Sequence, residues 1–293
     1  MTRAGIVTVV GKPNAGKSTL LNRMVGQKHA ITSPKPQSTR TRVVGIHTAG
    51  EVQMIILDTP GLLDPQYALH HVMRGTALEA LRDADVIVYL ADVTEGKPRP
   101  LAEVAALERP VGAPVIVVLN KADRLRPAER DGILDGQGDA MLVSALDGEG
   151  VDALVARLAE RLPESPFLYP ADDVSTQHLR FFAAELVRET ALEELDEEVP
   201  YSVACEIEEF REERDPVYIR AVLHVERDSQ KKILIGSKGT RIRDIGVAAR
   251  RKIEELIDHR VYLDLWVKVL PNWRRDPVAL RRLGYHLREE SDG

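Results

Sequence analysis

The sequence predicts an α/β protein of two domains, a doubly wound sheet followed by a smaller α+β domain. The chain has 293 residues, which is longer than most single hydrophobic cores. In its first half, apolar runs alternate with helical patterns, as in a sheet covered by helices on both faces. Prolines then interrupt residues 163–170, and the pattern changes. We therefore predict a first domain at 1–165, a linker at 166–176 and a second domain at 177–293.

Composition places the chain among ordinary proteins of a reducing compartment. Apolar residues make up 44% of the chain and charged residues 29%, and the one cysteine, Cys205, excludes an internal disulfide framework. No signal peptide precedes the first strand, and no apolar run approaches the ~20 residues of a membrane span. We therefore expect a cytoplasmic protein. A net charge of −6 argues against nucleic-acid binding only if the charge is evenly spread, which it is not.

The first apolar run, residues 5–10, leads through a glycine-bounded loop into a helical pattern. The loop reads GKPNAGKS, and its strand–loop–helix context is the one in which G-x-x-x-x-G-K-S binds nucleotide phosphates with backbone N–H groups. Lys17 is predicted to reach the β- and γ-phosphates, and the Ser18 hydroxyl to ligate Mg²⁺. The predicted phosphate-binding residues are Gly11, Lys12, Pro13, Asn14, Ala15, Gly16, Lys17, Ser18 and Thr19.

A later strand, residues 52–57, ends in the sequence DTPG. A carboxylate at this place, Asp58, holds Mg²⁺ through water in P-loop proteins, and the glycine lets a backbone N–H approach the γ-phosphate. The polar segment 31–42 lies between the two motifs and has no regular period, so we predict a first switch loop there. Its candidate metal ligands are Ser38, Thr39 and Thr41. The predicted nucleotide-binding set here is Asp58, Thr59, Pro60, Gly61 and Leu62.

The strand at residues 115–119 ends in the sequence NKAD, which decides the base. The Asp123 carboxylate can accept hydrogen bonds from guanine N1–H and the exocyclic amine, whereas adenine would leave the charge unpaired. Asn120 would tie neighbouring loops and reach the base, and the Lys121 stem would cover its ring. The remaining predicted contacts are Ala122, Ser144 and Ala145, whose backbone N–H is expected to read guanine O6. The predicted nucleotide is GTP.

The second half contains a G-x-x-G sequence inside a basic segment. A long helix (177–198), two strands, a helix, a loop, a second helix (248–257) and a last strand (261–269) give the order of a K-homology (KH) domain, whose G-x-x-G loop lets a nucleic-acid backbone approach. The basic run extends to Lys252 against one carboxylate, Asp244. The alternative is that these basic residues only form a solvent-exposed face and bind no nucleic acid. The predicted RNA-binding residues are Lys231, Lys232, Ile235, Gly236, Ser237, Lys238, Gly239, Arg241, Arg243, Arg250 and Arg251.

A GTPase half joined to a G-x-x-G half resembles the Era family, bacterial GTPases of small-ribosomal-subunit maturation. The resemblance covers nearly the whole chain, and its most specific pieces are PYSVACEIEEF, HVERDSQKKILIG and VYLDLWVKVLPNWR. It implies a type II KH domain that binds 16S rRNA near its 3′ end in a GTP-dependent way, slow GTP hydrolysis, and a role in 30S subunit assembly. We also expect a monomer, and a peripheral membrane contact stays open because a basic patch suits anionic lipid.

The resemblance further assigns roles within the nucleotide site. Thr39 matches the switch threonine, and Asn14 matches an asparagine associated with a potassium ion near the phosphates. The implied catalytic set is Lys17, Thr39, Asp58, Gly61 and Asn14. Leu62 occupies the position at which Ras-like proteins carry a water-positioning glutamine, so slow turnover is expected.

Two rival functions stay open, and two features depart from the family pattern. The chain could be a GTPase of another pathway, or an RNA chaperone whose GTP site never turns over. The segment between Asp123 and Ser144 is short and glycine-containing, which predicts a reduced helix. The tail 286–293 is predicted to lack regular structure.

Overall fold

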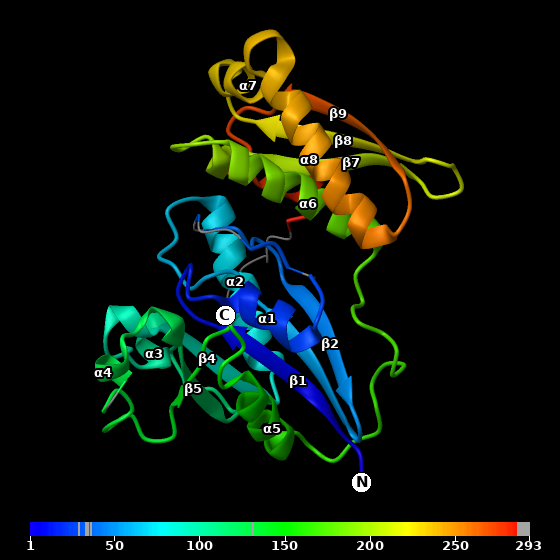
Figure 1. Ribbon diagram of the computed structural model, residues 1–293. Coiled ribbons are helices and arrows are strands. Elements are labelled where there is room, and N and C mark those ends of the chain that lie inside the picture. The colour runs from blue at the N-terminus through cyan, green and yellow to red at the C-terminus, as the bar shows by residue number, and fades with distance from the viewer. Residues whose placement is uncertain (29, 33–34, 36, 131, 286–293) are drawn as a thin grey trace. The chain divides into compact units, whose positions relative to one another are not determined.

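The computed structural model describes all residues except 29, 33–34, 36, 131 and 286–293, so the predicted tail lies outside the described residues. The chain divides into two compact units (Figure 1). Unit 1 comprises Met1–Pro65 and Met73–Thr176, and unit 2 comprises Gln66–Val72 and the chain from Gln177 onward. No helix in the described part of the chain is long and apolar enough to cross a membrane.

Unit 1 is built on a six-stranded sheet with the order β2-β3-β1-β4-β5-β6. β2 runs antiparallel to β3, and the other neighbours are parallel. The predicted doubly wound α/β fold is confirmed. The strands are β1 (Arg3–Val10), β2 (Val43–Ala49), β3 (Val52–Asp58), β4 (Val86–Asp92), β5 (Val115–Asn120) and β6 (Met141–Leu142). The helices are α1 (Lys17–Val25), α2 (Ala68–Asp83), α3 (Leu101–Val104), α4 (Pro127–Arg130) and α5 (Val151–Arg161), with 3₁₀ turns η1 (Val93–Glu95) and η2 (Ala122–Arg124). Residues 68–72 at the start of α2 are grouped with unit 2.

The parallel strands bring the predicted motifs to one edge of the sheet. β1 ends at Val10 before the P-loop, β3 ends at Asp58, and β5 ends at Asn120. Because the carboxyl ends of parallel strands share an edge, the loops that follow them surround one site. The helix predicted to be reduced is indeed short, since α4 spans Pro127–Arg130 before a series of turns.

Residues 166–176 pack along unit 1. Gln53 of β3 binds this segment through its side chain, which accepts from Leu168 N at 2.8 Å and donates to Tyr169 O at 2.9 Å. Ile46 N of β2 donates to Val174 O at 2.9 Å. The segment predicted as a linker is therefore held against strands β2 and β3.

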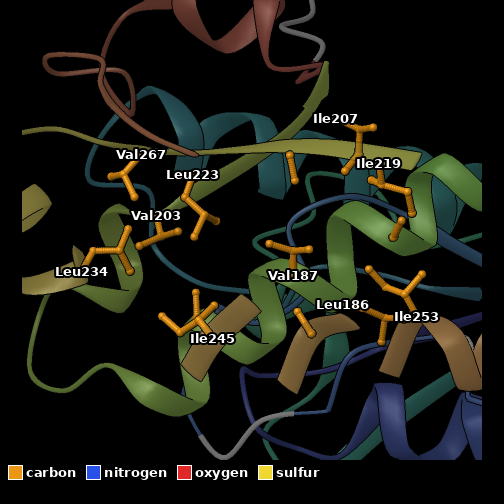
Figure 2. Close-up of a cluster of buried hydrophobic side chains, with 14 of the residues drawn as sticks. Leu186, Val187, Val203, Ile207, Ile219, Leu223, Leu234, Ile245, Ile253 and Val267 are labelled. Carbon is orange, nitrogen blue, oxygen red and sulfur yellow. The ribbon is translucent and has the colours of Figure 1, made fainter. Parts of the chain in front are cut away.

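Unit 2 places a three-stranded sheet, in the order β7-β8-β9, against helices. β7 and β8 are antiparallel, and β8 and β9 are parallel. Helices α6 and α8 pack on one face around the core side chains labelled in Figure 2. The elements are α6 (Leu179–Glu194), η3 (Pro200–Ser202), β7 (Ala204–Arg211), β8 (Val217–Val225), α7 (Asp228–Ile235), η4 (Ser237–Gly239), α8 (Thr240–Ile257), β9 (Val261–Val269) and α9 (Pro277–Arg282).

Helix α8 corrects one predicted boundary. The helix predicted to begin at residue 248 starts at Thr240, directly after the G-x-x-G loop. Arg241 and Arg243 are good helix formers, and Ile245, Ala249 and Ile253 give the helix a buried stripe that Gly246 does not interrupt. The basic residues 241–251 therefore all lie on one helix.

Candidate nucleotide site and RNA-binding face

A cavity of about 440 Å³ lies where the loops after β1, β3 and β5 meet. Its walls contain residues from all four predicted nucleotide motifs and from the first switch segment, whose residues 33, 34 and 36 lie outside the described part. The predicted site residues in the walls are Pro13, Asn14, Gly16, Lys17, Ser18, Thr19, Thr39, Gly61, Asn120, Lys121, Asp123 and Ala145.

Two glycines of this site have steric reasons to be glycine. Gly16 has a φ of +98°, and a Cβ there would clash with the Asn120 side chain. That close approach lets Asn120 Nδ2 donate to Ala15 O at 2.8 Å. A Cβ on Gly61 would lie 2.7 Å from Pro13 N, so the D-x-x-G loop meets the P-loop backbone to backbone.

Three oxygen-bearing side chains converge at one point of the site. Ser18 Oγ donates to Asp58 Oδ2 at 2.7 Å, Thr39 Oγ1 donates to the same oxygen at 3.2 Å, and the two hydroxyls lie 2.9 Å apart. Of the three candidates Ser38, Thr39 and Thr41, Thr39 is therefore the one that the structure joins to Asp58.

The same cluster fits Mg²⁺. Asp58 is fully buried, and its Oδ1 has no hydrogen-bond partner among the described residues. Burial raises the pKa of Asp58, although Lys17 and the hydrogen bonds from Ser18 and Thr39 act in the opposite direction. A buried carboxylate beside two hydroxyls is a hard oxygen donor set, which is what Mg²⁺ prefers.

Lys17 is buried beside this cluster. Its Nζ donates to Lys12 O at 3.0 Å, a contact that spans the P-loop. Burial lowers the pKa of Lys17 to about 8, against an opposing effect of the Asp58 carboxylate. A buried ammonium at the start of α1 is poised to gain from a phosphate anion.

Asn120 links the P-loop to the loop after β6. Its Oδ1 accepts from Ala145 N at 2.9 Å, in addition to the bond from Nδ2 to Ala15 O. This changes one expectation, because the Ala145 N–H that was assigned to guanine O6 is donated to Asn120 here. The Asp123 carboxylate is oriented by Ser144, whose Oγ donates to Asp123 Oδ1 at 2.7 Å.

Other predicted nucleotide residues lie outside the cavity walls. Leu62 is 5% exposed and packs in the core with Val10 and Ala77, while its N–H donates to Gly11 O at 2.9 Å. The Thr59 hydroxyl donates to Val9 O at 2.8 Å. Both residues hold the loop in place through these contacts. Also outside the walls are Gly11, Lys12, Ala15, Asp58, Pro60, Ala122 and Ser144.

Several residues of the site were not predicted from the sequence. Asp92, at the end of β4, forms an ion pair with Lys121, and Arg23 donates to Ala145 O and Leu146 O. The end of a parallel strand was the available signal for Asp92, whereas nothing local marks Arg23. Further wall residues outside the predicted nucleotide-binding set are Arg124 and Leu146, together with Ile31, Thr32, Gln37 and Ser38 of the predicted first switch segment, in which Ser38 was a candidate metal ligand.

In unit 2, the G-x-x-G loop turns the chain between α7 and α8. Gly236, Lys238 and Gly239 have φ of +72°, +49° and +76°, which gives the tight turn, and a Cβ on Gly236 would lie 2.8 Å from Arg241 Cβ. Arg241 Nη1 donates back to Ile233 O at 3.1 Å. The predicted residues that are exposed are Lys232, Ser237, Lys238, Arg243, Arg250 and Arg251, and those that are half-buried are Lys231, Ile235, Gly236, Gly239 and Arg241.

Lys252 does not belong to this basic face. Its Nζ lies 3.0 Å from Glu189 Oε2 and 2.6 Å from Glu193 Oε2, so it pairs with α6. The sequence counted it with the basic run because it adjoins Arg251, but successive helix residues point about 100° apart. We keep the name basic face for the other predicted arginines of α8, which are Arg241, Arg243, Arg250 and Arg251; the last three are exposed.

Two family models match separate parts of the chain. Residues 6–121 match the family model of the 50S ribosome-binding GTPase, and residues 198–274 match that of the KH domain. The chain is 43% identical to GTPase Era of Ectopseudomonas mendocina (strain ymp), over 97% of this chain and 98% of that protein. The chain belongs to the GTPase Era family. GTPase Era of Pseudomonas aeruginosa (strain LESB58) is 45% identical over 97% of this chain and 95% of its own length.

Solved Era structures also resemble the whole chain. A variant of Aquifex aeolicus Era bound to GDP.AlF4⁻ superimposes with a TM-score of 0.93 at 40% identity, covering 98% of this chain and 100% of that one. Era in complex with MgGDPNP and nucleotides 1506–1542 of 16S ribosomal RNA gives a TM-score of 0.91 at 41% identity, with the same coverage. The predicted GTPase domain followed by a KH domain is thus confirmed.

Proposed function

We propose that this Era-family GTPase is a GTP-dependent switch that binds small-subunit 16S rRNA near its 3′ end and assists assembly of the 30S subunit. The observation that carries the proposal is the joining of Ser18, Thr39 and Asp58 beside the cavity that also contains Asp123. A γ-phosphate sensor and a guanine-specific acceptor therefore share one site. The G-x-x-G loop of unit 2 and the complex of a relative with 16S rRNA support the RNA partner.

The chain's own residues divide the work on GTP. Lys17 would bind the β- and γ-phosphates, Asp123 would accept from the guanine edge, and Thr39 would bring the switch segment over the γ-phosphate. Ser18 and Thr39 directly, and Asp58 through water, would hold Mg²⁺, which would neutralise the phosphate charge. Since Thr39 belongs to the first switch segment, loss of the γ-phosphate and of its Mg²⁺ would remove the ligands that hold this segment over the site, and so release it.

Hydrolysis is expected to be slow because Leu62, the residue after D-x-x-G, has no polar group that could orient the attacking water. Leu62 faces the core beneath the loop rather than the cavity. Measured release of phosphate from GTP by the isolated protein, with and without Mg²⁺, tests this. Fast turnover would contradict the proposal, and absence of turnover under every cation would favour the RNA chaperone with a structural GTP site.

We further propose that potassium assists hydrolysis near Asn14. Asn14 lines the cavity with a φ of +62°, beside the P-loop lysine. A monovalent cation there could neutralise the transition-state charge that an arginine finger neutralises elsewhere. Stimulation by KCl over NaCl in the wild type, reduced in Asn14→Ala, is expected. Equal rates in the two salts would rule out this role.

The decisive experiment is binding of a short RNA with the sequence of the 16S 3′ end, in the presence of GDP and of a non-hydrolysable GTP analogue, at two salt concentrations. Tighter binding with the analogue and rejection of a scrambled RNA at both salts would support the switch. Equal and steeply salt-dependent binding of both RNAs would mean that the basic face attracts phosphate without regard to RNA sequence.

The Gly239→Asp variant separates this function from a GTPase of another pathway. The φ of +76° at Gly239 disfavours any side chain, and the added carboxylate repels phosphate. We expect loss of rRNA binding with GTP hydrolysis intact. Unchanged rRNA binding would favour the other pathway. We propose that the protein acts as a cytoplasmic monomer with domain boundaries at residues 166–176. Peripheral contact with anionic lipid is a second interaction that the basic face would suit.

A further inference from the structure

The sheet of unit 2 has a second face, opposite to α6 and α8. Along β9, Val261, Leu263, Leu265 and Val267 belong to the core, so the alternating residues Tyr262, Asp264, Trp266 and Lys268 lie on the outer face. Tyr262 is 59% exposed and Trp266 is 55% exposed. They are the aromatic side chains in the described part of the chain that are more than half exposed.

These aromatic side chains are held in fixed orientations. Tyr218 of β8 stacks on Tyr262, with ring centroids 5.9 Å apart and planes inclined by 12°. Asp264 lies between the strands: its Oδ2 accepts from Tyr218 OH at 2.9 Å, and its Oδ1 accepts from Trp266 Nε1 at 2.7 Å. We call Tyr218, Tyr262 and Trp266 the aromatic platform.

Most of the charges around the platform are paired. The guanidinium groups of Arg211, Arg214 and Arg220 lie 5.5–5.8 Å from the Tyr218 centroid. Arg220 also pairs with Asp264, and Arg211 with Glu209. Paired charges give little long-range attraction for phosphate, so the main feature that this face offers is ring surface. Nucleobases stack on such rings with little dependence on their identity.

The platform is better suited to bases than to a protein. The core of a protein–protein interface is depleted in charged residues. Here Asp264 and Arg220 occupy the centre, between the rings, and the surroundings are charged rather than aliphatic. Polar groups at the ring edges suit the hydrogen-bonding edges of unpaired bases.

The platform lies on β9, the strand against which α7 and α8, the helices on either side of the G-x-x-G loop, pack. We call the surface beside residues 236–239 the G-x-x-G groove, because a KH domain takes about four nucleotides there. β9 is the edge strand of the sheet, and α7 and α8 pack against it from the core side. An RNA chain held at residues 236–239 therefore reaches the outer face by passing the free edge of β9. Tyr262 and Trp266 are four positions apart, about 13 Å along the strand, which lets one chain place separate bases on the two rings.

We propose that the aromatic platform binds unpaired bases of the single-stranded RNA that extends beyond the G-x-x-G groove. This inference rests on the proposed rRNA-binding function and adds a second contact to it. The contact is stacking, so its contribution changes little with salt, whereas the contribution of the basic face falls steeply with salt.

Tryptophan fluorescence provides a direct test, because the chain contains two tryptophans. Trp273 is buried and donates Nε1–H to Ser202 O at 2.8 Å, so acrylamide reaches Trp266 selectively. An RNA of about four nucleotides fills only the groove, and one of about twelve nucleotides from the 16S 3′ end extends beyond it. We expect the longer RNA alone to protect Trp266 from acrylamide.

Substitutions complete the experiment. Trp266→Ala and Tyr262→Ala should each weaken binding of the longer RNA about tenfold, at low and high salt alike, and leave binding of the shorter RNA and GTP hydrolysis unchanged. The matched controls Trp266→Phe and Tyr262→Phe keep a stacking ring and should retain most of the affinity. Both positions are exposed, so the variants should fold, and an unaltered melting temperature verifies this.

Several outcomes overturn the proposal. If the longer RNA binds in a manner abolished by Gly239→Asp, yet leaves acrylamide quenching of Trp266 unchanged, the platform is not an RNA site although the proposed function stands. Unchanged RNA affinity in both alanine variants, with weaker co-sedimentation with small subunits, assigns the face to a ribosomal protein instead. Failure of the wild type to bind either RNA removes both this proposal and the proposed function.

Discussion

Lys121 Nζ lies 2.5 Å from Asp92 Oδ2, so the lysine of the N-K-x-D motif is anchored to the end of the neighbouring strand β4. Both side chains are more than four-fifths buried. Asp92 is itself fixed, because its Oδ1 accepts from Thr94 N at 3.0 Å and from Thr94 Oγ1 at 2.7 Å. The geometry makes Asp92 a positioning residue for the lysine stem that would cover the guanine ring.

The first prediction concerns this pair. Asp92→Ala should weaken GDP and GTP binding about tenfold, the equivalent of one charge-assisted hydrogen bond. In a Lys121→Ala background the same change should have almost no further effect, because Asp92 acts through Lys121. Titration with fluorescent nucleotides measures the affinities. Thr94→Val, which removes only the turn hydroxyl, is the control, and additive losses would show that Asp92 acts independently.

The second prediction concerns the missing glutamine. Leu62→Gln should not accelerate GTP hydrolysis, because the side chain at this position points into the core with Val10 and Ala77. It should instead lower the free energy of unfolding by about 1–3 kcal/mol, since a polar amide is buried without partners suited to it. Single-turnover hydrolysis and thermal unfolding measure the two effects. A rise in the hydrolysis rate would mean that the loop after D-x-x-G changes conformation when nucleotide binds and brings residue 62 to the cavity.

The third prediction compares two neighbours on α8. Lys252→Met removes the cation that pairs with Glu189, a carboxylate 1% exposed, and should cost about 1–3 kcal/mol of stability. Its effect on RNA affinity should be small. Arg251→Met, at an exposed position of the basic face, should reverse this pattern, with weaker RNA binding, a reduced salt slope and unchanged stability. Comparable losses of RNA affinity in the two variants would show that Lys252 also binds RNA, contrary to this prediction.

The fourth prediction concerns pH. His224 is buried, and burial lowers its pKa, against an opposing effect of Glu206 at 2.9 Å; Arg282 of α9 and Lys268 of β9 lower it further. The unfolded chain therefore binds the proton more readily, and stability falls as the pH drops below about 6.5. His224→Gln should flatten this loss between about pH 6.5 and pH 5. Urea unfolding monitored by tryptophan fluorescence reports on this unit, which contains both tryptophans. Equal pH slopes for variant and wild type would contradict the assignment.

The two-domain plan and three of the four nucleotide motifs could be predicted from strand ends in the amino-acid sequence. Each of these signals is local: the glycine-bounded loop, Asp58 and Asn120 follow directly from the ends of apolar strands, and the topology rule for parallel sheets brings such ends together. The order of helices and strands around residues 236–239 likewise predicted the KH domain. Contiguous residues dictate backbone conformation, so these features needed no knowledge of distant neighbours.

Only the folded structure showed which side chains come together in the nucleotide site and which are already engaged in hydrogen bonds or ion pairs. Thr39 contacts Ser18 and Asp58, which are 21 and 19 positions away in the sequence. Lys252 pairs with Glu189, 63 positions away. Asp92 pairs with Lys121, 29 positions away. The Ala145 N–H donates to Asn120. Burial and pairing depend on which residues folding brings within a few ångströms, and a linear pattern does not contain that information.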